Sequence, residues 1–141
     1  MTIKTVPHIN LRGDARAALE FYRTVFGGDL VAVTYADAHS VTDPAEADQI
    51  MWGEVSSPEG FRVMAYDVPA ARPWSPGEHP FFVSIRSEDA KQITTYWKGL
   101  SARATVVVPL APAGWAPLYR MLTDEFGVTW VLDVAVAYPA A

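Results

Sequence analysis

A histidine near the start of the chain is the first residue whose type suggests chemistry. His8 lies in the stretch VPHINLR, whose alternation puts His8, Asn10 and Arg12 on one face and Ile9 and Leu11 on the other. Imidazole can bind a metal ion or transfer a proton near neutral pH. His8 is therefore either a metal ligand of an enzyme site or a polar residue that begins a strand.

Other polar and aromatic side chains lie on stretches that alternate in the same way. Glu54 shares a face with Trp52 in QIMWGEV, where it is either a base or hydrogen-bonding group in a cavity or a solvated carboxylate. Tyr66 and Tyr119 either stack on a ligand or pack within the protein. These residues favour a site that holds a small molecule, with the alternative readings still open.

Several reaction types lack the residues that they need. Cysteine is absent, which excludes thiolate nucleophiles, disulfides and cysteine-based zinc sites. The serines do not lie in a strand–GxSxG–helix context, so hydrolase chemistry has no support. Arg12 and Arg120 could bind an anionic ligand, but single arginines on strands usually pair with carboxylates at the surface.

Charge and composition limit the partners. The net charge of −5 argues against a broad nucleic-acid surface, and no apolar run approaches the roughly 20 residues that span a bilayer. The N-terminus MTIKTVPH lacks the apolar segment of a secretory signal. We therefore expect a cytoplasmic protein that binds neither nucleic acid nor membrane.

The size and the aromatic content fit one globular domain over the whole chain, residues 1–141. The chain has 141 residues, half of them apolar, which suffices for a buried core. Five Trp, six Tyr and six Phe could fill that core, line a pocket or support a dimer interface.

The first half of the chain predicts one helix and four strands. A helix is expected up to Phe26, because apolar residues recur at helical spacing from Ala15. Asp14 is its expected N-cap and Gly27-Gly28 its C-cap. Strands are expected at VPHINLR, DLVAVTYAD, QIMWGEV and FRVMAYDV.

The second half repeats this order after the proline-rich segment PAARPWSPGEHP, which reads as a linker. Strands are expected at FFVSIRS, ATVVVPL, PLYRMLTD and TWVLDV, and a helix at EDAKQITTYWKGL with Ser87 as its N-cap. Leu11-Arg12 matches Ile85-Arg86 in the two halves. The sequence therefore predicts an α+β fold of two βαβββ modules, about residues 5–70 and 79–135.

Two curved mixed sheets with their helices outside would enclose a cleft, the usual place for a small ligand. Trp115, in a Gly/Pro loop, either covers this cleft or forms a dimer contact. If Phe81, Val83 and Ile85 pack on the helix, Phe82 faces the cleft. The expected lining is His8, Trp52, Glu54, Met64, Tyr66, Phe82 and Tyr119.

The chain resembles the vicinal oxygen chelate superfamily, which includes glyoxalases, bleomycin resistance proteins and extradiol dioxygenases, and within it the PhnB-like group. The resemblance rests on PHINLRGDARAALEFYRTVFGGDL, DQIMWGEV and WAPLYRMLTDEFGVTW. It covers about residues 5 to 135, and it implies the paired βαβββ fold. It also implies a homodimer as the expected assembly, since strand swapping is common in this fold.

The resemblance further implies a possible divalent metal, such as Zn, Ni, Mn or Fe, held by His and Glu side chains from four equivalent strands. His8 matches the first of these positions, and Glu54, His79 and Asp133 complete the candidate set. His79 is out of phase with its strand. Trp52 stands where many PhnB-like relatives have a histidine.

Two functions follow from the resemblance. The first is a glyoxalase-like protein that binds a small apolar or aromatic molecule without a reaction, as the drug-binding resistance members do. The alternative is a metal-dependent lyase, isomerase or dioxygenase.

Overall fold

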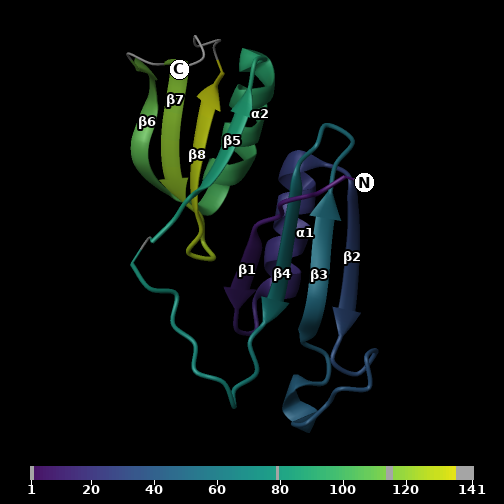
Figure 1. The fold of residues 1–141 in the computed structure, drawn as a ribbon. Helices are drawn as coiled ribbons and strands as arrows, with labels where there is room; N and C mark the ends of the chain where they lie inside the picture. The colour runs from purple at the N-terminus through teal and green to yellow at the C-terminus, as the bar shows by residue number, and fades with distance from the viewer. Residues whose placement is uncertain (1, 79, 114–115, 136–141) are drawn as a thin grey trace. The chain divides into compact units, whose positions relative to one another are not determined.

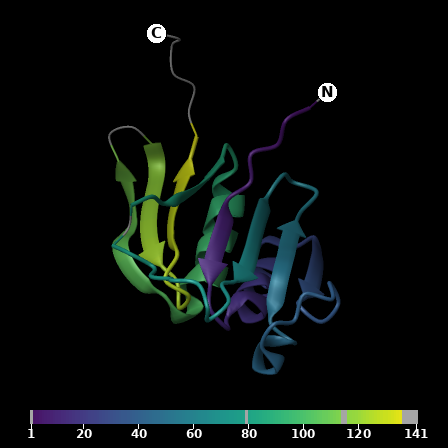
Figure 2. The ribbon, with the colours of Figure 1, turned by 60° about the horizontal axis from the view of Figure 1, so that its bottom comes forward.

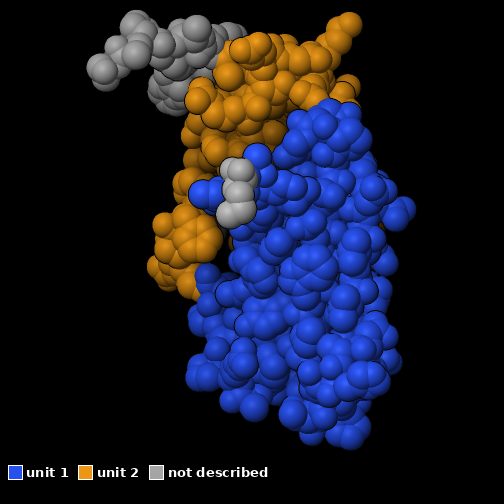
Figure 3. Space-filling model, turned by 45° about the vertical axis from the view of Figure 1, so that its right-hand side comes forward, with its two compact units in different colours: residues 1–76 blue, residues 77–141 orange. Residues whose placement is uncertain are grey.

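A computed structural model describes residues 2–78, 80–113 and 116–135 of the chain. The chain divides into two compact units, residues 1–76 and 77–141, coloured separately in Figure 3. We call them unit 1 and unit 2. Their boundary falls inside the proline-rich segment that the sequence analysis reads as a linker. Each unit carries its own four-stranded sheet.

Unit 1 is a βαβββ module, as predicted. Its first strand runs parallel to its last, and the other neighbours are antiparallel, in the order β1-β4-β3-β2 (Figure 1). The elements are β1 (His8–Leu11), α1 (Ala15–Phe26), β2 (Asp29–Thr34), the short 3-10 helix η1 (Pro44–Glu46), β3 (Ile50–Ser56) and β4 (Arg62–Asp67).

Helix α1 packs against one face of this sheet (Figure 1 and Figure 2). Its spacing of apolar residues gives it one continuous apolar face. A side chain on Gly53 would collide with Leu19, so glycine lets the helix approach β3 closely. Phe26 extends the core by stacking on Phe61 with ring centroids 3.7 Å apart. The buried apolar residues between helix and sheet are Ala15, Ala18, Leu19, Tyr22, Phe26, Ile50, Val55, Val63 and Ala65.

A buried carboxylate at the end of β4 holds the beginning of α1. Asp67 accepts hydrogen bonds from the backbone N–H groups of Gly13 (2.7 Å), Ala15 (3.0 Å) and Ile50 (2.9 Å). Asp14 occupies the N-cap position but makes no capping hydrogen bond with its side chain. The predicted N-cap position is therefore confirmed, but its side chain makes no capping bond, because a carboxylate distant in the sequence satisfies amides at this helix start.

Unit 2 repeats the module, again as predicted. Its strand order is β5-β8-β7-β6, with β5 parallel to β8 and the others antiparallel (Figure 1). The elements are β5 (Val83–Ser87), α2 (Ala90–Leu100), the 3-10 helix η2 (Ser101–Arg103), β6 (Thr105–Ala113), β7 (Ala116–Thr123) and β8 (Thr129–Val134).

The start of unit 2 differs from the prediction in two places. Strand β5 begins at Val83, and Phe81 is 80% exposed, so Phe81 does not pack on the helix. Asp89 caps α2 by accepting from the N–H of Lys91 (2.9 Å), whereas Ser87 accepts from the N–H of Asp89 (3.1 Å). Ser87 thus stabilises the turn before the helix, and the cap lies two residues later.

A second buried carboxylate orders the turn between β7 and β8. Asp124 accepts from the backbone N–H groups of Phe126 (2.9 Å) and Val128 (3.0 Å) and from the indole N–H of Trp130 (2.9 Å). Trp130 is fully buried, so this bond satisfies its one polar group inside the core. In the part of the chain that the structure describes, no helix has the length and apolar character needed to cross a membrane.

Candidate functional site

The sheet of unit 1 has a face turned away from α1, which we call open face 1. The strand register aligns His8 with Met64 and Met64 with Glu54 across β1, β4 and β3. Asn10 lies opposite Tyr66 in the same register. Alternation places Trp52 beside Glu54, because Gly53 and Val55 point to the helix. Open face 1 therefore joins His8, Asn10, Trp52, Glu54, Met64 and Tyr66.

His8 is held on this face by two neighbours. Its ring lies edge-on to the ring of Tyr66, with centroids 5.3 Å apart and an interplanar angle of 62°. Its Nδ1 atom lies 3.2 Å from Oδ1 of Asn10. Both contacts come from residues on the same face, so the imidazole has a defined orientation even though His8 is exposed.

A loose ion pair supplies the charge on open face 1. Arg62 Nη1 lies 3.9 Å from Glu54 Oε1, and the two side chains are 33% and 15% exposed. At this distance the pair is held by charge attraction rather than by a short hydrogen bond. The carboxylate of Glu54 thus keeps acceptor capacity that a ligand can use.

The corresponding face of unit 2, open face 2, carries a tighter pair. Asp133 accepts from Nε of Arg86 with both oxygens, at 3.1 and 3.2 Å, and its side chain is 9% exposed. Tyr119 lies opposite Asp133 in the register of β7 and β8. Arg86 was not among the predicted site residues. Its match to Arg12 in the internal repeat was the signal in the sequence that pointed to it, whereas the parallel pairing of β5 with β8 comes from the structure.

The predicted site residues fall into four groups. His8, Trp52, Glu54, Met64 and Tyr66 share open face 1, and Tyr119 and Asp133 share open face 2. Phe82 precedes β5 and is 45% exposed. His79 and Trp115 lie outside the described residues.

The four predicted metal ligands come from both units, and His79 lies outside the described residues, so their assembly stays a prediction. Glu54 pairs with Arg62, and Asp133 is bonded to Arg86. Met64 separates His8 from Glu54 on open face 1. Within residues 2–78, 80–113 and 116–135, no three His, Asp or Glu side chains are grouped so as to hold a metal ion. A divalent ion needs three or four ligands, and the described residues of neither unit alone supply such a set.

Arg12 and Arg120, the two arginines predicted to lie on strands, make contacts within the protein. Arg12 donates to the carbonyl oxygens of Val68 and Pro69, both at 3.3 Å, and its guanidinium lies 5.6 Å from the centre of the Trp74 ring. Arg120 is buried on the α2 side of the sheet, 4.5 Å from the centre of the Trp97 ring. The expectation of a carboxylate partner at the surface is therefore wrong for both.

Burial leaves Arg120 short of partners. Its Nε atom has no hydrogen-bond partner among the described residues. Burial lowers the pKa of Arg120 to about 10, which is still far above neutral pH. The guanidinium is therefore charged, and the face of the Trp97 ring is its main compensation.

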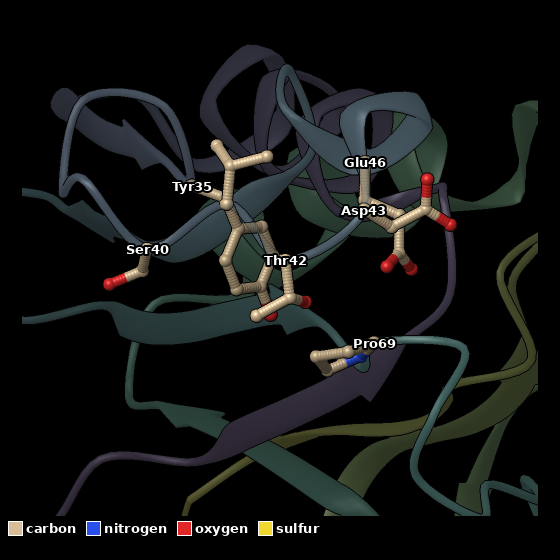
Figure 4. A pocket seen from close by; sticks show the side chains of 7 residues that line it. Tyr35, Ser40, Thr42, Asp43, Glu46 and Pro69 are labelled. Carbon is tan, nitrogen blue, oxygen red and sulfur yellow. The ribbon is translucent and has the colours of Figure 1, made fainter.

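A small pocket lies elsewhere in unit 1, between the loop after β2 and the segment after β4 (Figure 4). Its enclosed volume is about 10 Å³, far below the roughly 300–1,000 Å³ of ligand pockets. The Tyr35 hydroxyl donates to the carbonyl oxygen of Asp67 (2.6 Å), and Glu46 accepts from the N–H of Ala70 (2.8 Å). The lining residues are Tyr35, Ser40, Val41, Thr42, Asp43, Glu46 and Pro69.

This pocket contains none of the predicted site residues, and four of its polar side chains are already bonded within the protein: Tyr35, Ser40, Asp43 and Glu46. Burial is the main cause that raises the pKa of Tyr35, with further contributions from nearby Tyr66 and Asp67. We therefore place the candidate site on open face 1 rather than in this pocket.

Solved structures with the same fold come from several bacteria. The protein PA1353 from Pseudomonas aeruginosa is 27% identical, with a TM-score of 0.82 over 94% of this chain and 98% of that one. A PhnB protein from Bacillus cereus, described as a putative 3-demethylubiquinone-9 3-methyltransferase, is 20% identical, with a TM-score of 0.72 over 94% and 100%. TioX from Micromonospora sp. ML1 is also 20% identical, with a TM-score of 0.57 over 94% and 100%.

Comparison with curated protein sequences gives no match. The family model described as Glyoxalase/Bleomycin resistance protein/Dioxygenase superfamily matches residues 5–132, which includes both βαβββ modules. The chain belongs to the glyoxalase/bleomycin resistance protein/dioxygenase superfamily.

Proposed function

We propose that the chain binds a small apolar or aromatic molecule, without a reaction, on open face 1. The observation that carries this proposal is the grouping of Trp52, Met64 and Tyr66 with His8 on one sheet face. Aromatic and thioether side chains of this kind give large, adaptable contact area to a planar ligand. Ligand sites combine such a lining with a few polar groups, here His8 and the Glu54–Arg62 pair.

The packing of unit 1 supports the use of this face. The core of the module lies on the other side of the sheet, where α1 covers it. Trp52, Met64 and Tyr66 are only half-buried, so they are not needed to complete that core. Aromatic surface outside a core is often a binding site.

The alternative, a metal-dependent lyase, isomerase or dioxygenase, has less support. It requires several donors around one ion, and the candidate carboxylates of Glu54 and Asp133 each have an arginine partner. Simple binding requires only the residues that open face 1 already brings together. Binding therefore requires fewer specific contacts from the described residues than metal-dependent catalysis does.

Titration with aromatic probes tests this proposal. Binding of 1-naphthol, quinoline and naphthalene to the purified chain is followed by isothermal calorimetry. We expect saturable binding of at least one probe, weakened about tenfold by Trp52→Ala, because a central aromatic contact contributes more than 1 kcal/mol.

Trp97→Phe is the matched control, since Trp97 lies on the helix side of the other unit's sheet. Circular dichroism checks that both variants are folded. Saturation by none of the three probes, or equal affinity for wild type and Trp52→Ala, would contradict binding on open face 1.

A further inference from the structure

The orientation of His8 leaves one of its ring nitrogens unused. Nδ1 faces the side-chain oxygen of Asn10 at 3.2 Å, while the Tyr66 ring lies edge-on to the imidazole with centroids 5.3 Å apart. Nε2 has no partner among the residues that the structure describes. The ring is thus fixed through one nitrogen and presents the other.

The partner of Nδ1 decides where the ring proton lies. The side-chain oxygen of Asn10 can only accept a hydrogen bond. A bond from Nδ1 to this oxygen therefore requires the proton on Nδ1, and in the neutral ring Nε2 then carries a lone pair. The second ring nitrogen becomes a hydrogen-bond acceptor.

Asn10 itself is held by the chain that follows β4. The indole N–H of Trp74 donates to the backbone carbonyl of Asn10 at 3.0 Å. The guanidinium of Arg12 lies over the same indole ring and binds the carbonyls of Val68 and Pro69. These contacts stabilise the backbone of β1 at the residue that orients His8.

We propose that Asn10 is a positioning residue that keeps the proton of His8 on Nδ1, so that Nε2 accepts a hydrogen bond from a hydroxyl or N–H group of an aromatic ligand. This inference rests on the proposed function and names its ligand class. Glu54, another polar group on open face 1 with acceptor capacity, favours the same class. An aromatic ligand that bears a donor group is preferred over one that bears only acceptors.

The repeat offers an internal comparison for this arrangement. The match of Leu11-Arg12 to Ile85-Arg86 places Phe82 where unit 1 has His8 and Ser84 where it has Asn10. A phenylalanine at the first position cannot accept a hydrogen bond in this way. The pair of His8 and Asn10, which selects a ligand with a donor group, therefore has no counterpart at the matching positions of open face 2.

The first test measures the tautomer of His8 directly and requires no ligand. Long-range ¹H–¹⁵N NMR at about pH 9, where an ordinary imidazole is neutral, reports which nitrogen of each of the three histidines is protonated. His8→Phe assigns the His8 signals by their loss. We expect Nδ1–H in the wild type, a mixture of tautomers in Asn10→Val, and Nδ1–H again in Asn10→Asp, which restores an acceptor.

The second test compares two ligands that differ by one donor. The wild type is expected to bind 1-naphthol about fivefold more tightly than 1-methoxynaphthalene, the effect of about one hydrogen bond. His8→Phe is expected to remove this preference, and Asn10→Val to reduce it while 1-methoxynaphthalene binds unchanged. A merely structural role of Asn10 would weaken both ligands equally.

The failures of the two proposals can be told apart. An Nε2–H tautomer in the wild type would overturn the role of Asn10, whatever binds. Equal affinity for the two compounds would overturn the ligand class while leaving the proposed function intact. If neither compound binds, the ligand class fails, and the proposed function fails with it only when quinoline and naphthalene do not bind either; the tautomer is measured in every case.

Discussion

The two modules share one topology but stabilise it with different polar contacts. Arg12 and Arg86 occupy matching places in the repeat, yet Arg12 binds backbone carbonyls after β4 and Arg86 binds the carboxylate of Asp133. Each module also buries one aspartate that accepts three N–H groups. Asp67 connects three segments of unit 1, whereas Asp124 serves one turn and the tryptophan that follows it.

This difference shows which parts of the module the fold requires. The apolar spacing of helix and strands recurs in both halves, so it sets the topology. The polar side chains that bind the backbone at the ends of the helices and strands differ between the halves. Different side chains can therefore satisfy the free backbone groups at these ends without a change of fold. Open face 1 and open face 2 can therefore differ in chemistry without a change of fold.

Removal of the buried aspartates is expected to have the largest effect and to separate the two modules. Asp67→Ala leaves three amides without their acceptor, at a cost of about 3–6 kcal/mol in the free energy of unfolding. Asp124→Ala is expected to cost less, about 2–3 kcal/mol, since Phe126 and Val128 are only half-buried and water can replace the carboxylate. Urea denaturation measures both.

If Asp67→Ala does not fold, Asp67→Asn provides the comparison with Asp124→Asn, because the amide keeps one acceptor oxygen. Equal losses for the two aspartates would refute the distinction between a contact that joins segments and one that orders a turn.

The matching arginines are expected to differ in their response to salt. Arg86→Met and Arg12→Met should each lower stability by about 1–2 kcal/mol, since each removes hydrogen bonds of a charged donor. Only the loss at Arg86 should shrink in 1 M NaCl, because its acceptor is a charged, partly accessible carboxylate. The measurement is urea denaturation at low and high salt, and a matching salt response at Arg12 would contradict the assignment.

Arg120 is expected to be dispensable for stability. Arg120→Met removes a desolvated guanidinium that has no carboxylate partner among the described residues, and we expect stability unchanged or raised by about 1 kcal/mol. Thermal unfolding at pH 7 is the readout, with Trp97→Phe as a companion variant for the ring beneath the guanidinium. A loss of more than about 2 kcal/mol would show that the contact with Trp97 outweighs the cost of burial.

The smallest effect is expected at Tyr35, whose hydroxyl donates to the backbone of the Asp67 segment. Tyr35→Phe should cost at most about 1 kcal/mol near neutral pH. Because the folded state raises the pKa of Tyr35 above its ordinary value of 10.0, this contribution is complete below that pH and declines as the pH rises through the folded value. The difference between wild type and variant is followed from about pH 8 to pH 11, and it would stay constant if the folded state did not raise the pKa of Tyr35.

Local sequence patterns predicted the helices and strands of both modules, but not the side-chain contacts at the ends of these elements. The period of two in TWVLDV and the helical spacing from Ala15 to Phe26 are read within a few residues, and both elements were found. Asp14 and Ser87 have the right type for caps, yet carboxylates at Asp67 and Asp89 make the capping bonds. The Asp67 contact depends on a chain reversal of more than 50 residues, which no local pattern contains.

The candidate site was predicted only as far as strand alternation reaches. Alternation brought His8, Trp52, Glu54, Met64 and Tyr66 to one face, because side chains on a strand change sides at every residue. The partner of Asp133 depends on the pairing of β5 with β8, which pattern alone did not supply. The burial of Arg120 follows in part from strand alternation, because alternation places Arg120 on the same side of β7 as the apolar residue Leu122.

The two buried aspartates also imply an order of folding. The partners of Asp124 are two, four and six residues away in the chain, so the β7–β8 turn can close as soon as its own residues meet. The partners of Asp67 are 54, 52 and 17 residues away. These hydrogen bonds can form only after long loops have closed. We therefore expect the amides of Gly13, Ala15 and Ile50 to gain protection from hydrogen exchange together, and later than those of the β7–β8 turn.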